Sequence, residues 1–587
     1  MEKICLVREP VDNYPRLEII GRPSVKYPEY PFTDISDENN QVYQMVREGL
    51  YCLQMDIENY GTPKWNPFGS FIKSGNCVLV KPNLVLDENV NGCGVECLYT
   101  QPSVVAPIID YIWIALKGRG KIIIGDAPLQ ECDFEKLIRQ SGYDALIDYY
   151  QDKGVNIELI DFRNVKTYEK NDLHYLQEDE ASNGVIVHLD ENSAFAEFSD
   201  TQLERLRITN YDPRILREHH HDRKHEYNIS QYVLNADVII NMPKPKTHRK
   251  AGVTISLKNL VGINANKEFL PHHMLGGKDE GGDAYLKGNV YLSMANEILD
   301  MRNKLMHDNQ MESAQLAARL YGNLLNIGRE QTNEEYWEGS WYGNDTIWRT
   351  TVDLNKILLY ADKKGVIQQK RQRKLFIVAD MIVSGQKEGP LEPTPIYPGI
   401  IAMGWDPLLF DRVVCSIMGF DYKNIPTLYN NELCGGRLNV SDDGAYCILS
   451  NNELWDGKSL KFIRENVSLE FEPTYGWMKK LGSRYRNRII DTIKKNGNRV
   501  YVFGVGINGV YAANELIKEH IEIAGFVDNN RNYWETDIIN GIKCLAPEEI
   551  DKSIPFIIAT RDRYIKEIKR QLIQLGGNVI GCINRGD

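Results

Sequence analysis

The sequence predicts an α/β protein in which a mostly parallel sheet carries helices on both faces, with a helical insertion and a second, small α/β domain at the C-terminus. Three observations predict this class: short apolar runs bounded by turn residues, helical patterns between several of them such as 100–116, and a glycine-rich turn near residue 504. Strands that alternate with helices are typical of parallel sheets buried on both faces. The expected strands are CVLV (77–80), KIII (121–124), NIELI (156–160), DVII (237–240), LFIVA (375–379) and GIIAM (399–403).

The helical insertion is expected at about 268–372. Apolar residues recur at helical spacing in 290–327 and again in 344–362, where Trp348 is expected to pack in the core. The segment HHMLGGKDEGGDAYLKGN (272–289) is rich in Gly and charge, which predicts a mobile loop and a candidate lid.

Length and composition predict a folded protein of several domains. The chain has 587 residues, of which 42% are hydrophobic and 26% charged, and these are ordinary values for a globular protein. We expect four segments: an N-terminal extension (1–70) that packs on the main domain, a main α/β domain (71–470), a basic linker helix (471–494) and a Rossmann-like domain (495–587).

Charge and cysteine usage exclude several classes. A formal net charge of −12 disfavours a general nucleic-acid binder. No apolar segment approaches the length of a membrane span, and the first residues lack the apolar core of a signal peptide, so we expect a cytoplasmic protein without membrane insertion. The eleven cysteines are odd in number and widely spaced, and Cys93 and Cys97 form a lone C-x3-C. Neither a disulfide framework nor an integral iron–sulfur cluster is therefore expected.

Polar residues follow five of the expected strands. In an open parallel sheet the carboxyl ends of the strands face one crevice, where ligands bind. Each residue taken alone could equally be a turn residue or a helix cap, and Asp406 followed by Pro407 reads well as a cap. The residues in question are Lys81 and Asn83, Asp126, Asn241 and Lys244, Asp380, and Asp406.

The stretch NMPKPKTHRKAGVTISLKNLVGINANK (241–267) holds six Lys or Arg and one His but no acidic residue. A solvated basic loop is the simpler interpretation. Placed after a buried strand, however, the stretch predicts one wall of an anion-binding site, because clustered lysines repel one another unless an anion offsets the repulsion. A partly desolvated Lys or His there can act as an acid or a base, and Glu388 in the tight turn GQKEGP is a further candidate base.

These arguments give one set of candidate site residues. The expected catalytic residues are His248, Glu388 and Lys258. The expected substrate-binding residues are Lys81, Asn83, Asp126, Lys244, Lys246, Thr247, Asn259, Asp380 and Asp406. Asp126, Asp380 and Asp406 would orient the lysines or hold a divalent cation, which makes such a cation a candidate cofactor.

A glycine pattern opens the C-terminal domain. Gly504, Gly506 and Gly509 form G-x-G-x-x-G between a strand and a helix, and Asp528 follows nineteen residues after the last glycine. This arrangement predicts a nucleotide whose phosphate lies at the helix N-terminus and whose ribose meets the acid. The alternative is a nucleotide-type fold retained as a scaffold.

A second metal candidate is the histidine-rich segment REHHHDRKHEYN. His221 and His225 are four residues apart, as helix-borne metal ligands would require. Because the segment is strongly polar, a solvated helix or loop is the preferred interpretation.

Several ordered motifs together resemble one family. VLVKPNLV, IIIGDAP, ADVIINMPKPKTH, GVTISLKNLVGI, ADMIVSGQKEGP and GWDPLLFDRVVCSIMGFD resemble successive segments of the domain of unknown function 362 family, over roughly residues 70–425. ANKEFLPHH and NDTIWRTTVDLN resemble a subgroup found in bacterial surface-polysaccharide gene neighbourhoods. The C-terminal FGVGINGVYAANEL resembles Rossmann-like modules attached to sugar-modifying transferases and methyltransferases.

The resemblance and the basic stretch together imply an enzyme that acts on an anionic, sugar-related metabolite in surface-polysaccharide biosynthesis. The expected partners are this small molecule and, as an open alternative, a second copy of the chain. Two other functions remain open. One is a non-catalytic nucleotide-sensing or assembly protein, and the other is a redox protein that works with an external iron–sulfur partner.

Overall fold

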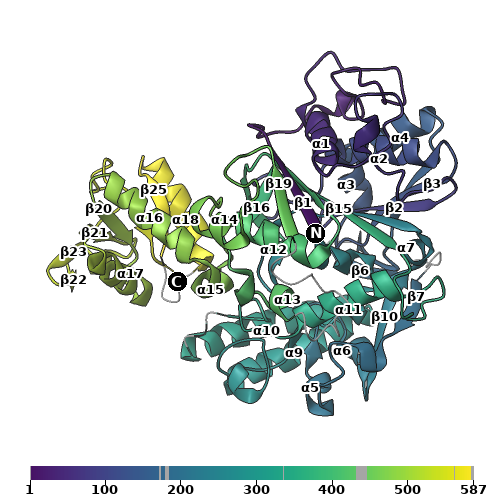
Figure 1. Cartoon of the computed structure of the whole chain (residues 1–587). Helices are drawn as coiled ribbons and strands as arrows, with labels where there is room; N and C mark the ends of the chain where they lie inside the picture. Colours follow the sequence, from purple (N-terminus) through teal and green to yellow (C-terminus); the bar gives the residue numbers. More distant parts are fainter. Residues whose placement is uncertain are drawn as a thin grey trace. The chain divides into compact units, whose positions relative to one another are not determined.

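The computed structural model describes residues 2–170, 173–178, 184–332, 334, 336–430, 446–560 and 562–583. Cys434 lies outside these residues. The chain folds into two compact units, Met1–Leu469 and Glu470–Asp587, and each combines helices with a sheet, which confirms the α/β class (Figure 1). None of the helices in the described part of the chain is long and apolar enough to cross a membrane.

The first unit is built around an eight-stranded sheet in the order β19-β1-β18-β15-β11-β2-β3-β4. The six apolar runs expected to form strands all lie in this sheet. The five neighbours from β15 to β4 are parallel, and their residues are mostly buried, as expected for strands covered on both faces. The strands are β1 (Glu2–Arg8), β2 (Cys77–Pro82), β3 (Lys121–Asp126), β4 (Ile157–Asp161), β11 (Val238–Met242), β15 (Lys374–Met381), β18 (Ile400–Gly404) and β19 (Tyr446–Ser450).

Strand β18 runs opposite to its neighbours. Ile377 pairs with Gly404 and Met381 with Ile400, so β18 is antiparallel to β15, and it is antiparallel to β1 as well. The prediction that its carboxyl end delivers Asp406 to the common edge is therefore wrong. Asp406 lies beyond the opposite edge of the sheet.

The N-terminal segment contributes a strand as well as packing on the main domain. β1 lies between β18 and β19, and its residues from Ile4 to Val7 are buried. The segment after it supplies α1 (Gln41–Cys52), which packs against α2 (Pro102–Leu116) and β1.

Helices cover both faces of the sheet, as expected. Val78 and Val80 of β2 belong to a core shared with α1, α2 and α4 (Tyr143–Asp152). Figure 1 shows these helices on one side of the sheet and α11 (Ile347–Tyr360) and α12 (Pro407–Ile417) on the other.

A small second sheet lies beyond the carboxyl ends of β11 and β15. Its order is β13-β12-β16-β17, and β12 follows β11 while β16 follows β15. These strands are β12 (Lys246–His248), β13 (Gly252–Thr254), β16 (Ser384–Glu388) and β17 (Glu392–Ile396).

The insertion forms helices α9 (Val290–His307) and α10 (Met311–Thr332), followed by α11, in which Trp348 is buried as expected. The segment 272–289, expected to be a mobile loop and a candidate lid, is instead held to the rest of the unit by strand pairing and hydrogen bonds. Its strand β14 (His273–Met274) pairs with β8 (Leu206–Arg207). The buried carboxylate of Asp283 accepts hydrogen bonds from the Asp345 N–H (2.9 Å) and the Thr346 hydroxyl (2.6 Å).

The second unit is a six-stranded sheet in the order β22-β23-β21-β20-β24-β25, parallel except for β22. Helix α16 (Ser483–Lys495), in the segment expected to be a basic linker, packs Ile489 and Ile493 into the core of this unit. The other α-helices and β-strands described in this unit are α15 (Met478–Leu481), β20 (Arg499–Phe503), α17 (Ile507–Lys518), β21 (Glu522–Val527), β22 (Asp537–Ile539), β23 (Ile542–Leu545), β24 (Phe556–Ile558), α18 (Asp562–Gln574) and β25 (Val579–Cys582).

Candidate functional site

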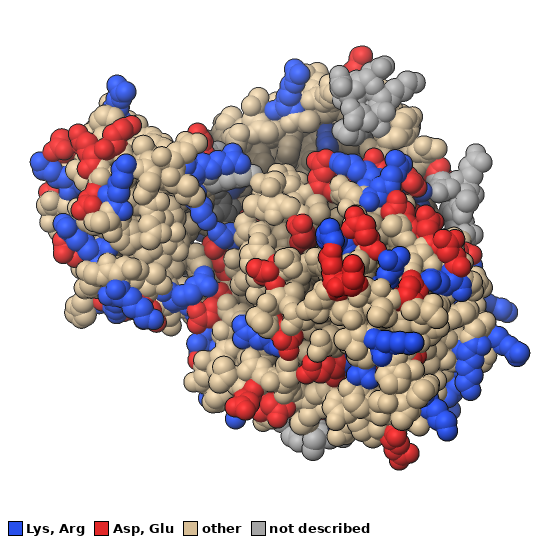
Figure 2. Space-filling model, turned by 90° about the horizontal axis from the view of Figure 1, so that it is seen from above, with Lys and Arg blue, Asp and Glu red and all other residues tan. Residues whose placement is uncertain are grey.

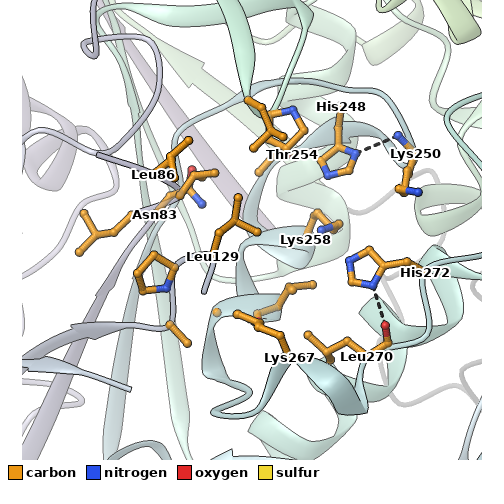
Figure 3. Close-up of a pocket in the computed structure, with 18 of the residues that line it drawn as sticks. Asn83, Leu86, Leu129, His248, Lys250, Thr254, Lys258, Lys267, Leu270 and His272 are labelled. Carbon is orange, nitrogen blue, oxygen red and sulfur yellow. Dashed lines mark hydrogen bonds between the residues drawn. The ribbon is translucent and has the colours of Figure 1, made fainter. Parts of the chain in front are cut away.

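A cavity of about 370 Å³ lies beyond the carboxyl ends of β2 and β3. Its two sides differ in chemistry. Figure 3 shows Leu86 and Leu129 on one side and Lys250, Lys258 and His272 on the other. A ligand that matches the cavity therefore has an apolar part and an anionic part.

The cavity has an excess of positive charge. Of its two acidic side chains, Asp126 is neutralised by Lys81, a buried lysine that does not itself line the cavity. On the face of the molecule seen in Figure 2, by contrast, Lys and Arg are interspersed with Asp and Glu. The cationic lining side chains are Arg249, Lys250, Lys258 and Lys267, and the acidic ones are Asp126 and Glu131.

Two of the predicted anion-binding lysines instead form buried ion pairs with aspartates of the same unit. Lys81 Nζ lies 2.7 Å from Oδ1 of Asp126, and Lys244 Nζ lies 2.9 Å from Oδ2 of Asp380, with all four side chains buried. Burial lowers the pKa of both lysines, although each carboxylate opposes this effect. Lys81, Lys244 and Asp380 do not line the cavity, so the prediction that they bind substrate is not supported by their positions.

The Asp380 pair joins distant segments of the first unit. Its carboxylate also accepts hydrogen bonds from the Tyr14 hydroxyl (2.7 Å) and the Gln101 N–H (3.0 Å), and Lys244 Nζ donates to the Tyr14 oxygen (2.6 Å). The N-terminal segment, the start of α2 and the ends of β11 and β15 meet at this pair. Its role is therefore structural.

Lys246 is buried without a carboxylate partner among the described residues. Its ammonium group donates to Asn83 Oδ1 (2.6 Å) and to the Leu98 carbonyl oxygen. Burial, reinforced by the charge of Lys244, lowers its pKa to about 7. Lys246 lies outside the cavity lining, whereas Asn83, which it holds in place, is part of that lining.

Lys258 is one of the three lysines that line the cavity. It is partly exposed, and the described part of the structure places no hydrogen-bond or ion-pair partner at its Nζ. Burial, reinforced by the charge of Lys250, lowers its pKa to about 8. Lys267, which also lines the cavity, has its pKa lowered to about 7 by burial, and within the described residues its Nζ bonds only the Val261 carbonyl oxygen, at 3.4 Å.

A buried network fixes the short helix α8 (Ser256–Asn259) that carries Lys258. The Asp411 carboxylate accepts from the Ser256 N–H (2.9 Å) and the Leu257 N–H (3.0 Å). Asn355 donates to the Leu257 carbonyl oxygen (3.0 Å). Sequence reasoning named Asp406, which caps α12, and missed Asp411 one turn later on the same helix.

Two histidines flank Lys258 and are held in opposite tautomers. His248 Nδ1 accepts from the Lys250 and Ala251 N–H groups (both 3.1 Å), so its proton is on Nε2. His272 Nδ1 lies 2.6 Å from the Leu270 carbonyl oxygen, which can only accept, so its proton is on Nδ1 and Nε2 is free to accept. Burial, followed by the charge of Lys258, lowers both pKa values well below the usual range. Both imidazoles are therefore neutral at pH 7.

Gly262 explains how the cavity wall can lie directly on the Lys81 pair. A Cβ at this position would lie 1.8 Å from Asp126 Oδ1 and 2.7 Å from Lys81 Nζ. A backbone hydrogen bond also joins the two segments, because the Ala127 N–H, next to Asp126, donates to the Gly262 carbonyl oxygen (2.9 Å). Only glycine fits here without displacing the ion pair.

Only some of the predicted site residues line the cavity. Thr247 bonds the Lys387 carbonyl oxygen (2.7 Å) and thereby joins β12 to β16. Glu388 ends β16 outside the lining, although Pro390 and Leu391 belong to it. Sequence reasoning quoted Lys250 and Lys267 without singling them out and assigned His272 to a lid. The predicted residues that line the cavity are Asn83, Asp126, His248, Lys258 and Asn259.

The described residues contain no group of three or more His, Cys, Asp or Glu side chains placed to hold a metal ion. The suggestion that Asp126, Asp380 and Asp406 share a cation fails because two are paired with lysines and the third caps a helix. Of the predicted pair, His221 is exposed in β9 (His220–His221) and His225 is buried in β10 (Lys224–Ser230), so they are not placed one helical turn apart. His220 is also buried, and its Nδ1 lies 3.3 Å from Nδ1 of His225.

In the second unit, the glycines occupy the turn between β20 and α17. Gly504 has φ +111°, and a Cβ on Gly509 would lie 1.9 Å from the Gly504 carbonyl oxygen. Gly506, at the start of α17, faces open space. Asp528 turns its carboxylate toward the same loop, with Oδ2 3.3 Å from the Val505 N–H.

Family models match both units. The chain belongs to the family described as domain of unknown function (DUF362), whose model matches residues 78–186 and 192–416, and this range contains the whole cavity lining. A second model, described as C2185-like, N-terminal, matches residues 496–579. The resemblance to the domain of unknown function 362 family, inferred from the motifs in residues 70–425, is thereby confirmed.

One curated relative is the thylakoid-associated protein sll1697 of Synechocystis. It is 26% identical over 211 residues, which make up 36% of this chain and 46% of the relative. The chain thus covers less than half the length of this relative.

Proposed function

We propose that the chain is an enzyme that binds a phosphorylated or carboxylated metabolite in the cavity around Lys258. The observation that carries the proposal is the partly desolvated Lys258 amine, which projects into the cavity with no partner for its charge among the described residues. Holding Lys258, Lys267 and Lys250 together is electrostatically unfavourable. A bound anion would relieve this repulsion, and the lowered pKa values of the three lysines are typical of groups that move protons.

Catalysis is favoured over simple binding by the two histidines. His248 offers an N–H and His272 offers a lone pair on the same cavity, and both are fixed by backbone hydrogen bonds. A donor and an acceptor held at one ligand can polarise a carbonyl or hydroxyl and move a proton. We assign sugar-related metabolites of surface-polysaccharide biosynthesis as the substrate class, on the motifs ANKEFLPHH and NDTIWRTTVDLN.

Binding can be tested with matched ligands. Glucose 1-phosphate should raise the melting temperature of the protein and glucose should not, because only the former carries an anion for Lys258. Lys258→Met should abolish this shift. The matched control Lys64→Met removes an exposed lysine of the same unit and should leave it unchanged. Equal shifts for the wild type and Lys258→Met would contradict the proposed anion site.

Turnover needs a separate test. Incubation with a panel of sugar phosphates and sugar acids, followed by mass spectrometry, should show consumption of one class by the wild type. Lys258→Met should leave the same compounds unchanged. If several compounds bind and none is consumed, the anion site stands and the enzyme assignment falls.

A second candidate function is nucleotide sensing by the C-terminal unit, favoured by the open position of Gly506 at the start of α17. Since nothing in the described structure crowds this glycine, Gly506→Leu should fold normally and still block a phosphate. Calorimetric titration with ADP and UDP checks this. Equal binding by the wild type and Gly506→Leu would exclude this loop as the nucleotide site.

A further inference from the structure

The amine of Lys258 lies between His248 and His272 in the cavity (Figure 3). All three side chains line the same cavity, and the Lys258 charge, after burial, contributes to the lowered pKa of both imidazoles. The three groups are a primary amine, an N–H donor and a lone-pair acceptor. This is the set of groups needed to add an amine to a carbonyl and to remove the resulting hydroxyl.

We infer that Lys258 forms an imine with an aldehyde or ketone that also carries a phosphate or carboxylate group. The inference deepens the proposed function, since it assumes that the cavity binds an anionic metabolite. The carbonyl would face Lys258 while the anionic group meets Lys267 and Lys250.

The step balances without an external reagent. His272 Nε2 takes a proton from the Lys258 ammonium group, and the free amine attacks the carbonyl carbon, forming the C–N bond. The carbonyl oxygen, hydrogen-bonded by His248 Nε2–H, gains the proton that the attacking nitrogen loses, which gives a neutral carbinolamine. The C–O bond then breaks, and the hydroxyl leaves as water with the proton returned by His272. The products are a protonated imine and one water molecule.

Other buried lysines of this region are less suited to the reaction. Lys81 and Lys244 are held by carboxylates, and Lys246 donates to two oxygens outside the cavity. Lys250 donates to the Thr209 hydroxyl (3.2 Å) and the Glu338 carbonyl oxygen. Lys258 combines access to the cavity with an amine that holds no such bond, and its lowered pKa leaves more of it unprotonated at neutral pH than an exposed lysine.

The apolar side of the cavity favours the same chemistry. Leu86 and Leu129 line it, and their side chains limit the water beside the reacting carbon. Because imine formation releases water, a partly dry site shifts the equilibrium toward the imine.

Borohydride trapping tests the inference with matched ligands. Dihydroxyacetone phosphate and pyruvate each carry a carbonyl and an anionic group, and glycerol 3-phosphate matches the first but lacks the carbonyl. The wild type is incubated with each compound at pH 7.5 in the presence of sodium borohydride, which reduces an imine to a stable secondary amine. Peptide mass spectrometry then locates the adduct.

We expect about one adduct per chain, on Lys258, with dihydroxyacetone phosphate or pyruvate and none with glycerol 3-phosphate. Lys258→Met should lose the adduct while keeping its fold by circular dichroism, and Lys64→Met should retain it. His272→Gln, which leaves the amine in place, should slow adduct formation at least tenfold.

The outcomes separate this inference from the proposed function. If glycerol 3-phosphate raises the melting temperature but neither carbonyl compound labels Lys258, the anion site stands and the imine is excluded. Labelling spread equally over surface lysines such as Lys64 also overturns the inference. If none of the three compounds binds or labels, both the imine and the proposed function fail for these substrate classes.

Discussion

Lys244 Nζ lies 2.9 Å from Oδ2 of Asp380, and both side chains are fully buried. Lys258, fourteen residues later, has a similar charge and no such partner among the described residues. One basic stretch therefore supplies two kinds of lysine, a structural one whose charge is neutralised within the fold and one whose charge is available to a ligand. Replacing each of these lysines by methionine should therefore have opposite effects on the stability of the protein.

Lys244→Met should destabilise the first unit by about 3–5 kcal/mol, because it leaves Asp380 buried without its counter-ion. Lys258→Met should unfold at the same or a higher urea concentration than the wild type, since it removes a partly buried charge that has no partner. Urea unfolding followed by circular dichroism measures both. A loss of several kcal/mol in Lys258→Met would show that its charge is paired within the fold.

The stability difference between Lys258→Met and the wild type should depend on pH. The pKa of Lys258 falls from 10.5 to about 8 on folding, so between these values the folded state has already lost a proton that the unfolded state keeps. Raising the pH through this window stabilises the folded wild type by on the order of 2–3 kcal/mol relative to Lys258→Met. Thermal unfolding of both proteins at pH 7 and pH 10 should show the advantage of the variant shrinking, and a constant difference would contradict the lowered pKa.

Anion binding should weaken as the pH rises. Lys267, with a pKa of about 7, and Lys258, with a pKa of about 8, lose their charges in turn, so the attraction for an anion decreases. Inorganic sulfate is a suitable probe because its own charge stays constant over this range. Calorimetry should show at least tenfold weaker binding at pH 9 than at pH 6, and an affinity independent of pH would argue against these lysines as ligands.

Gly262→Ala should disrupt the wall of the cavity. Its Cβ would collide with Asp126 Oδ1 and Lys81 Nζ, so we expect destabilisation on the order of 3 kcal/mol and loss of sulfate binding. Gly322→Ala is the matched control, because Gly322 lies in α10 with open space around it. That change should be neutral or stabilise by up to about 1 kcal/mol. Equal effects of the two substitutions would refute the close contact at Gly262.

The two aspartates of α12 should behave differently. Asp411→Asn replaces a carboxylate that holds the N-terminus of α8, so it should displace Lys258 and weaken sulfate binding several-fold. Asp406→Asn keeps a good capping side chain at the other edge of the sheet and should leave binding unchanged. Calorimetry on both variants decides whether Asp411 positions the site.

The central strands could be predicted because strands buried on both faces are continuous apolar runs. The direction of β18 could not be read from its own residues, since the run GIIAM has the same pattern in either direction. A signal was present in the chain before it. Two parallel neighbours need a crossover, usually a helix, and residues 382–399 show no helical pattern. They form the β16–β17 hairpin, after which the chain returns antiparallel.

The site was predicted only where it is local in sequence. His248, Lys258 and Asn259 lie in one basic stretch and do line one cavity. Lys81 pairs with Asp126 because their strands are neighbours in the sheet, and the sequence separation does not reveal this. Lys81 was therefore predicted to bind a ligand, whereas its ammonium group is used inside the fold. His272 was assigned to a lid because its segment is rich in glycine. The backbone carbonyl that fixes its tautomer is visible only in the fold.

Among the strands that the structure describes, β1 pairs with β18 and β19 alone, whose residues lie at positions 400–404 and 446–450. During synthesis from the N-terminus, the parallel strands from β2 to β11 are complete long before either neighbour of β1 has been made. A nascent chain halted before residue 400 therefore carries its first strand as an unpaired hydrophobic edge, available to chaperones or to aggregation. Truncation of this protein from its C-terminal end thus removes the partners of its very first residues.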